Sequence, residues 1–332
     1  MEMLAATSVI ICASWRISTW LRTPSRPFVT AASVSSAYDD WTSEGILEYF
    51  WGEHIHLGYY EVTNWFNSDK TLTGCFFSGL FDMSCGIEAF RSAKENFVAR
   101  MCEFGRVCDI GHHLDIADIG CGIGGTSRVL AQTLDSCAVK GISISARQIE
   151  RAIELTAARG MKNVNYELAD AVHMPLIKSE TFDVVWICES SEHVSDKAAL
   201  LREACRILRP GGRLVMAAWC CREPRNVEEK WLKKYLEDEW SHPRFASIAE
   251  LSQILTEDIG MEELRVEDWT IHTLPSWYHS ILVGIWSPWI VVSRPHVWLK
   301  TIREIYTICL MHRAFTNGLM QYGMFAATKT RK

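Results

Sequence analysis

The sequence predicts an α/β fold built on a doubly wound, mostly parallel sheet with helices on both faces. Three observations support this fold class. Short apolar runs alternate with helical patterns through the middle of the chain, as in βαβ units. A glycine-rich turn at residues 118–124, with sequence DIGCGIG, follows the first apolar run and opens a helix. The sequence RPGG at residues 209–212 ends a later helix before another apolar run.

Each element follows from its local pattern, in chain order. Apolar residues from 114 lead into the glycine-rich turn as a first strand, and a helical pattern runs on from it to 134. Residues 182–188 are almost wholly apolar, which fits a strand covered on both faces. We also expect strands at 138–142, 163–168 and 213–219, and helices at 146–158 and 198–208.

The C-terminal third differs in composition from the middle of the chain. Residues 228–240 read as a charged amphipathic helix, and residues 319–328 as a closing strand. An apolar run at 281–292 is interrupted by Pro288 and is shorter than the roughly 20 residues that span a bilayer. With the aromatic residues around it, this run could line an apolar pocket or rest on a membrane surface. Burial in the core remains the ordinary explanation for any single one of them.

Composition narrows the classes of partner. The net charge is −6 and the charges are dispersed, so we expect no nucleic-acid partner. The 12 cysteines include no Cys-x-x-Cys pair, which argues against a zinc site and a disulfide scaffold. His54 and His56, like His112 and His113, lack further ligands at metal spacing, so we predict no metal. The sequence favours no particular oligomeric state.

Residues 1–38 have the composition of an organelle transit peptide: they carry three arginines and many Ser and Thr, with Glu2 as the one acid. A disordered or membrane-touching tail is the alternative. We exclude this segment from the fold. The remaining divisions expected are an N-terminal lid with substrate-covering helices (39–110), a nucleotide-binding core (111–222) and a C-terminal substrate region (223–332).

Four motifs together resemble the class I S-adenosylmethionine-dependent methyltransferases. They are the Asp-x-Gly-x-Gly-x-Gly turn at 118–124, Asp170 after the third strand, FDVVW at 182–186 and LRPGG at 208–212. The resemblance implies a Rossmann-like sheet of seven strands. It also implies S-adenosylmethionine as the cofactor. A nicotinamide-dependent dehydrogenase is the structural rival, but the second strand ends at Ser143 without the acidic residue expected beside a ribose.

The resemblance also implies where the cofactor lies. Its methionine end is expected beside Asp118 and the turn glycines, its ribose beside polar residues after the second strand, and its adenine after the third strand. Gly120 and Gly122 are hard to explain without a close ligand, whereas Ser145 could simply cap a helix. The expected cofactor residues are Asp118, Gly120, Gly122, Gly124, Ser143, Ser145, Gln148, Asp170 and Ala171.

Residues 189–193 follow the fourth strand and therefore lie at the functional edge of the sheet. His193, with an unperturbed pKa near 6.5, could take a proton from the acceptor. An ordinary hydrogen-bonded histidine is an equally good interpretation. Glu189 could orient the cofactor or the substrate.

Motifs at both ends of the chain narrow the resemblance to the tocopherol-pathway methyltransferases. They are AYDDWT at 37–42, WGEHIHLG at 51–58, SHPRFASI at 241–248, TLPSW at 273–277 and GMF at 323–325. The chain is most similar to the methyl-phytylbenzoquinol and methyl-solanesylbenzoquinol enzymes. This implies C-methylation of a prenylated, lipid-like benzoquinol in tocopherol or plastoquinone biosynthesis, in the plastid and with membrane contact left open. A cytoplasmic location is the alternative.

Two features depart from that family pattern. The segment at residues 64–90 is longer than expected for the family, and Ser-Ser-Glu at 190–192 replaces the stretch of small residues that is expected there. A second enzyme hypothesis is therefore kept, in which a small thioether or amino acid such as methylthiohydroxybutyrate is S- or N-methylated. The carboxylate group of such an acceptor would need a guanidinium partner in the pocket, for which Arg294, Arg303 and Arg313 are candidates. A third hypothesis is a catalytically silent, membrane-associated binding protein.

Overall fold

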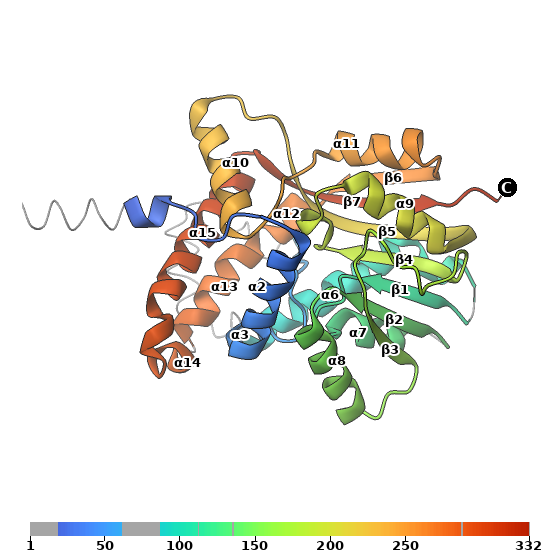
Figure 1. Cartoon of the computed structure of the whole chain (residues 1–332), viewed down its shortest axis with the longest axis horizontal. Helices are drawn as coiled ribbons and strands as arrows, with labels where there is room; N and C mark the ends of the chain where they lie inside the picture. Colours follow the sequence, from blue (N-terminus) through green and yellow to red (C-terminus); the bar gives the residue numbers. More distant parts are fainter. Residues whose placement is uncertain (1–18, 62–86, 112, 135, 287, 332) are drawn as a thin grey trace, which may run out of the picture.

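A seven-stranded sheet runs through the molecule in the order β3-β2-β1-β4-β5-β7-β6 (Figure 1). The computed structural model describes residues 19–61, 87–111, 113–134, 136–286 and 288–331. Strands β1 to β5 are parallel, and β7 pairs antiparallel with both β5 and β6. Their bounds are β1 (Asp115–Ile119), β2 (Ala138–Ser143), β3 (Val164–Leu168), β4 (Phe182–Cys188), β5 (Leu208–Cys221), β6 (Glu262–Asp268) and β7 (Met320–Thr328). The predicted α/β class is confirmed.

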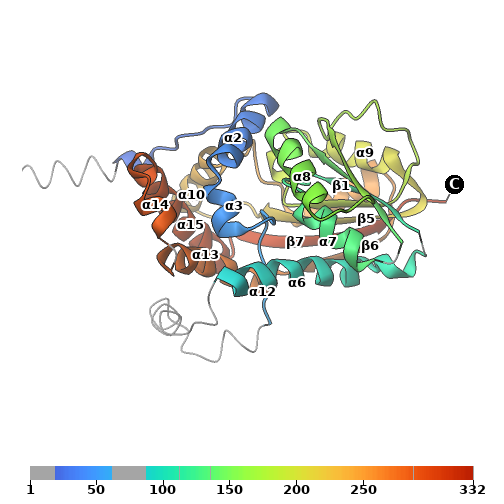
Figure 2. The same ribbon diagram turned by 90° about the horizontal axis from the view of Figure 1, so that it is seen from below.

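Helices cover both faces of the sheet (Figure 2). On one face lie α6 (Ile87–Gly105), α7 (Gly125–Thr133) and α8 (Ala146–Ala158); on the other lie α9 (Lys197–Ile207) and α11 (Ile248–Gln253). Strand β4 shows why both faces must be covered. Val184 and Trp186 are buried on the first face, and Val185 and Ile187 on the second. An apolar run of this kind is stable only between two layers.

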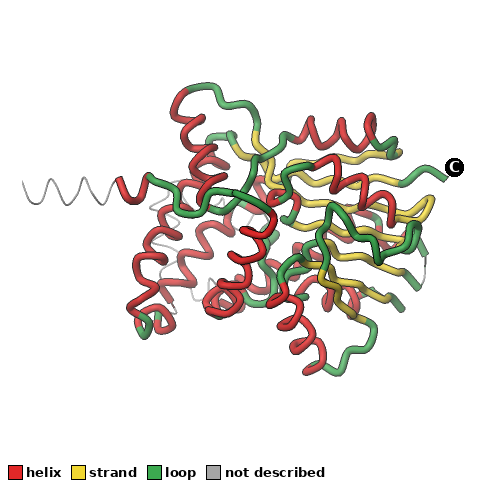
Figure 3. The backbone as a smooth tube through the Cα atoms, viewed as in Figure 1, coloured by secondary structure: helices red, strands yellow, loops and turns green. Residues whose placement is uncertain are grey.

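A largely helical half lies beside the carboxyl ends of the strands (Figure 3). It contains α2 (Ala31–Glu44), α3 (Ile46–Trp51), α10 (Val227–Glu239), α12 (Thr270–Thr273), α13 (Pro275–Trp286), α14 (Trp289–Val292) and α15 (Trp298–Thr316). The apolar run at 281–292 is divided at Pro288 into two helices, since α13 ends before this residue and α14 begins after it. No helix in the described part of the chain is long and apolar enough to cross a bilayer.

Three expectations from the sequence need correction. Strand β5 begins at Leu208 and includes the residues at 209–212, because Gly211 N–H bonds to Lys329 O and Gly212 O accepts from Lys329 N–H. Helix α6, placed with the lid region, packs on the sheet through Phe97 and Met101.

Residues 19–38, which we had excluded from the fold, are also part of it. Ser25 N–H and Oγ donate to the Glu239 carboxylate at 2.7 and 2.9 Å. Glu239 is fully buried and also receives Arg303 Nη1 at 3.2 Å. Arg26 reaches the same carboxylate and Glu304. We call residues 19–30 the N-terminal strap.

Arg303→Leu should destabilise the fold, because it leaves the Glu239 carboxylate buried with less compensating charge. Removing one partner of a buried ion pair typically costs about 3–5 kcal/mol. The measurement is urea-induced unfolding followed by circular dichroism. Arg313→Leu is the matched control, since its ion pair with Glu228 is exposed and should contribute less than about 1 kcal/mol. Equal unfolding midpoints for the two variants would contradict the structural role of this cluster.

Candidate active site

The glycine-rich turn leaves an open space at Gly122. Gly122 has a φ of +55°, and a Cβ atom added there would lie 3.9 Å from Ile55 Cδ1 and 4.0 Å from Gln148 Nε2. Nothing of the described protein therefore fills the position of a side chain. The neighbouring glycines differ: a Cβ on Gly120 would lie 2.2 Å from Ser190 Cβ, and one on Gly124 would lie 2.2 Å from Tyr166 Oη. Packing thus explains Gly120 and Gly124, which corrects the ligand explanation of Gly120. The space at Gly122 fits a bound group.

Asp118 lies at the carboxyl end of β1 and is buried. Its Oδ2 accepts a hydrogen bond from Ser127 Oγ at 2.6 Å. Burial raises the pKa of this carboxyl to about 6, although the Ser127 bond and the Arg128 charge oppose the rise. Asp118 is therefore ionised at neutral pH and can attract a positively charged group beside the turn.

Polar residues follow β2, but not all of them are free to bind. Ser143 Oγ donates to Gln148 Oε1 at 2.8 Å, which places both at the edge next to Gly122. Ser145 caps α8, since its Oγ accepts from Gln148 N–H at 3.1 Å. The same hydroxyl donates to Asp39 Oδ1 at 2.5 Å. Ser145 therefore caps α8, as the alternative interpretation of this residue predicts, and it also contacts α2.

Asp170 and Ala171 follow β3, in the turn expected beside adenine. Asp170 Oδ1 accepts from Val172 N–H at 3.1 Å, which fixes the turn. Ala171 is half-buried and packs against the core on the α9 face. All the predicted cofactor residues therefore lie at the carboxyl ends of three neighbouring strands, where ligands of such sheets bind.

A loop after α3 is fastened over the glycine-rich turn. The Glu53 carboxylate pairs with Arg128 at 2.7 Å and with Arg159 at 2.6 Å. Although burial alone would raise it, these bonds hold the pKa of Glu53 below its usual value. Farther along, Leu57 N–H donates to Glu189 Oε1 at 2.8 Å. These contacts hold the loop, which the sequence predicts to be part of a lid, against the turn.

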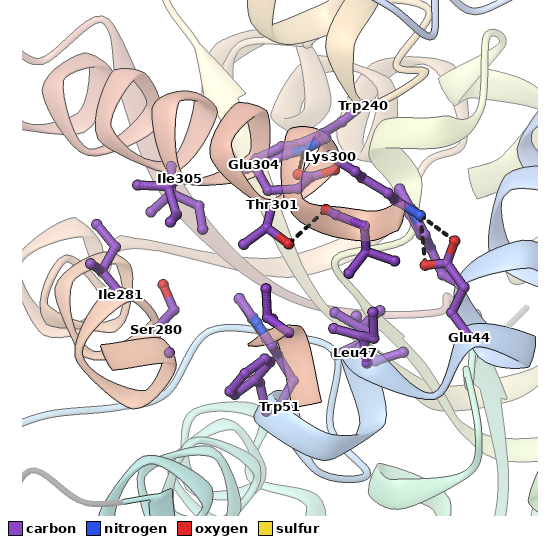
Figure 4. Close-up of a pocket in the computed structure, with 18 of the residues that line it drawn as sticks. Glu44, Leu47, Trp51, Trp240, Ser280, Ile281, Lys300, Thr301, Glu304 and Ile305 are labelled. Carbon is purple, nitrogen blue, oxygen red and sulfur yellow. Dashed lines mark hydrogen bonds and ion pairs between the residues drawn. The ribbon is translucent and has the colours of Figure 1, made fainter. Parts of the chain in front are cut away.

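A cavity of about 380 Å³ opens next to this loop, between α2 and α3 on one side and α13 to α15 on the other. Figure 4 shows Leu47 and Trp51 from α3 and Ile281 and Ile305 from α13 and α15 around this space. Its walls are mostly apolar. Ile55 lines the cavity and also neighbours the open space at Gly122. The cavity therefore borders the proposed cofactor position.

The cavity has two sets of polar groups: Glu44, Ser280, Lys300, Thr301 and Glu304 lie on α2, α13 and α15 (Figure 4), and a second set lies at the end nearest β4. The second set is Tyr38, Glu189, Glu192, His193 and His242. The His193 Nε2 atom lies 2.8 Å from Tyr38 Oη. The rings of His193 and His242 lie 4.4 Å apart. Glu192 Oε1 accepts the backbone N–H of Trp219.

Glu189 is held in an unusual conformation. Its φ of +46° lies in the left-handed region, which is uncommon for a residue with a side chain and often found at functional sites. Oε1 accepts from Leu57 N–H and, at 2.5 Å, from Tyr322 Oη. Burial raises its pKa to about 8, while the bonds from Tyr322 and Leu57 act in the opposite direction. The group therefore titrates close to neutral pH.

His193 titrates far from the value expected from the sequence. Burial, with help from the Lys197 charge, lowers its pKa to about 4. The ring is neutral at physiological pH, so it can exchange a hydrogen bond with the Tyr38 hydroxyl. A base near pH 6.5 is therefore not what the structure provides at this position.

Several cavity residues were not predicted as site residues. Tyr38 lies at the start of the aromatic segment that is expected to form a lid over the acceptor pocket. His242 lies within a motif that carries only the family resemblance, and Glu192 lies between the two residues proposed after the fourth strand. The signal that could have found Glu192 is its place after β4. Nothing in the local sequence marks Trp219 or Trp240. Trp277 is one of the aromatic residues around the run at 281–292, for which the sequence suggests an apolar pocket, and the three rings come together at the cavity only in the fold.

Two expectations fall partly outside the described residues: His112, and residues 64–86 of the long segment. Within the described ranges, no three His, Cys, Asp or Glu side chains lie close enough together to hold a metal ion. His54 and His56 instead bond to each other at 3.1 Å.

A family model described as a methyltransferase domain matches residues 117–216. The chain is 38% identical to the 2-methyl-6-phytyl-1,4-hydroquinone methyltransferase of Synechocystis sp., over 92% of this chain and 90% of that protein. It is 28% identical to the probable chloroplastic tocopherol O-methyltransferase of Oryza sativa subsp. japonica, over 89% of this chain and 77% of that protein.

A solved structure with the same fold is geranyl diphosphate C-methyltransferase from Streptomyces coelicolor A3(2), in complex with Mg²⁺, geranyl diphosphate and S-adenosyl-L-homocysteine. The TM-score is 0.65 at 17% identity, covering 90% of this chain and 97% of that one. At that identity the likeness concerns the fold alone.

Proposed function

This chain belongs to the class I S-adenosylmethionine-dependent methyltransferases, and from that membership we propose that it C-methylates the aromatic head of a prenylated benzoquinol in tocopherol or plastoquinone biosynthesis. The relative of known substrate class with 38% identity over 92% of the chain supports this assignment. The resemblance carried by both ends of the sequence points to the same acceptor class.

The shape of the cavity is the observation that carries the proposal. Its polar end, at Glu189 and His193, suits a hydroxylated ring. Its other walls are mostly apolar, with Ile281, Ile285 and Ile305 among them, and this lining suits a prenyl chain; Glu44, Ser280, Lys300, Thr301 and Glu304 are the polar residues there. Ligand sites of this kind place a few polar groups within a mostly apolar lining.

S-adenosylmethionine supplies an electrophilic methyl group on a sulfonium whose sulfur leaves as a neutral thioether. We assign its binding to Asp118, the turn around Gly122, Ser143, Gln148 and the turn at Asp170, with Ser145 acting through the cap of α8. Holding two reactants in line can account for about 7–11 kcal/mol of barrier lowering.

The proton of the acceptor hydroxyl needs a base. We assign that role to Glu189, whose Oε2 receives no hydrogen bond from the described residues and whose pKa of about 8 lies near working pH. Loss of the proton makes the ring carbons nucleophilic. His193 and Tyr38, bonded to each other, would position the ring. The sequence instead suggests His193 as the base and Glu189 as the orienting group, so the two residues exchange roles in this proposal.

A small acceptor with a carboxylate group would need a guanidinium partner in the cavity, and none of the three candidate arginines provides one. Arg303 is committed to Glu239 and to backbone carbonyls of the strap, and Arg313 to Glu228. Arg294 Nη1 donates to Glu44 O. None of the three is among the described residues that line the cavity, and Lys300, which does line it, pairs with Glu44.

The deciding experiment incubates the protein with methyl-labelled cofactor and a panel of acceptors. We expect label in 2-methyl-6-phytyl-1,4-hydroquinone, on a ring carbon by mass spectrometry, and none in methylthiohydroxybutyrate. Turnover of the thioether acid alone would overturn the acceptor assignment and leave the methyltransferase class intact. Absence of binding to S-adenosylhomocysteine would contradict the cofactor site as well.

We also propose that the protein works in the plastid. The transit-like composition of the N-terminal residues and the chloroplastic relative from rice support this location. Fluorescence imaging of the full chain fused to a reporter at its C-terminus tests it, and a diffuse cytoplasmic signal would contradict it.

A further inference from the structure

Exposed apolar side chains gather around one end of the acceptor cavity. They come from the end of α13, from α14 and from the first turns of α15, and they are Ile285, Trp289, Val292, Trp298, Leu299, Ile302 and Ile305. We call this set the apolar end. Trp289 is 73% exposed and Leu299 is 66% exposed, values that large apolar side chains rarely show in a group.

The apolar end is continuous with the cavity. Ile285, Val292 and Ile305 line the cavity and are also exposed. The exposed patch therefore adjoins the cavity lining, so an apolar chain that leaves the cavity on this side meets apolar side chains.

The stretch of sequence that forms most of the apolar end has no acidic side chain of its own. Residues 269–303 contain no Asp or Glu, although the chain as a whole has 40 of them and a net charge of −6. Arg294, His296 and Lys300 lie within this stretch. Lys300 pairs with the Glu44 carboxylate of α2, and Arg294 Nη1 donates to the Glu44 backbone carbonyl. An anionic surface that approaches the apolar end therefore meets no acidic side chain from residues 269–303.

The strap adds to the same end of the molecule. Trp20 packs under Arg303 of α15, with the guanidinium carbon 4.4 Å from the ring centre. Figure 1 shows the first described residues beside α15, on the side where α14 also lies. Residues 3–38 contain no acidic residue either. Two stretches without acids, far apart in sequence, thus meet here.

We propose that the apolar end docks on an anionic lipid bilayer, so that the prenyl tail passes between the membrane and the cavity while the ring reaches Glu189. This rests on the proposed function for the identity of the tail, but not for the docking. Tryptophan and leucine at the level of the headgroups, with basic residues beside them, are typical of interfacial binding. The membrane is contacted and not crossed.

The test measures flotation of the full chain with vesicles of equal parts phosphatidylcholine and phosphatidylglycerol, without acceptor. We expect the wild type to float, and Trp289→Ser with Leu299→Ser to lower partitioning on the order of tenfold. Neither residue lines the cavity. Leu176→Ser with Val227→Ser is the matched control, because these side chains are 83% and 82% exposed on other elements, and it should float like the wild type.

Activity separates docking from chemistry. A short-tailed quinol in solution should be methylated equally by all three proteins, whereas a phytyl quinol embedded in vesicles should be methylated more slowly by the Trp289 and Leu299 variant alone. A wild type that does not float, or a variant that floats equally, overturns the docking. A wild-type dimer that the variant converts to a monomer, without flotation, would assign the apolar end to a second copy of the chain. Failure to methylate either quinol while flotation holds would instead overturn the proposed acceptor.

Discussion

Gly122→Val is expected to weaken binding of S-adenosylhomocysteine by roughly 10- to 100-fold or more, as measured by isothermal titration calorimetry. The nearest described atoms to an added Cβ lie 3.9 and 4.0 Å away, so the protein itself can accept a side chain there. Valine would instead occupy the space that we assign to the cofactor, and forcing atoms into filled space costs about 1–3 kcal/mol or more.

Backbone strain must be separated from that effect, since Gly122 has a φ of +55°. Gly160→Val is the matched control: its φ is +64°, it has no neighbour within 4 Å, and it lies at the exposed end of α8. Both variants should lose about 1 kcal/mol or more of stability to the left-handed conformation. Only the Gly122 variant should lose binding. Equal binding by both variants would remove the cofactor from the glycine-rich turn.

Glu189→Gln is expected to lower kcat by about 10²–10⁴-fold, the usual contribution of a general base. The amide oxygen can still accept hydrogen bonds from Leu57 N–H and Tyr322 Oη, so the loop over the turn should keep its place. Cofactor affinity is therefore expected to remain near the wild-type value. A turnover number close to that of the wild type would exclude Glu189 as the base.

The pH profile distinguishes Glu189 from His193. If Glu189 is the base, kcat/KM rises as the pH increases through about 8, because the ionised form is the active one. If His193 is the base, with a pKa of about 4, activity is level across the neutral range and His193→Ala carries the large loss. Tyr322→Phe removes a bond that lowers the pKa of Glu189, so it should move the rising limb to higher pH. An unmoved limb would contradict the assignment.

The central sheet could be predicted because its strands are buried apolar runs with short connections. Strands β1, β2, β3 and β4 and helix α8 lie within a residue or two of the expected ranges. Strand β6, with sequence EELRVED, could not be predicted because all of its side chains are exposed or half-buried and no apolar alternation marks it. The start of β5 was placed too late because Pro and Gly usually end regular structure.

The candidate site was predictable where it depends on local sequence and unpredictable where it depends on distant contacts. The turn at Gly122 and the carboxylate of Glu189 follow directly from their places after β1 and β4. The pKa of His193 depends on burial and on Lys197. The cavity joins α3 with α13 and α15, which lie more than two hundred residues apart in the chain. No local sequence pattern can predict that these helices come together around one cavity.

The buried carboxylate of Glu239 sets a limit on how far the N-terminus can be trimmed by a protease. Ser25 and Arg26 supply several of its hydrogen bonds, and a protease that cut after them would strip those donors from a charge with no access to water. Trimming that preserves a working enzyme should therefore stop ahead of Ser25. The first stable fragment in a limited digest would reveal where that boundary lies.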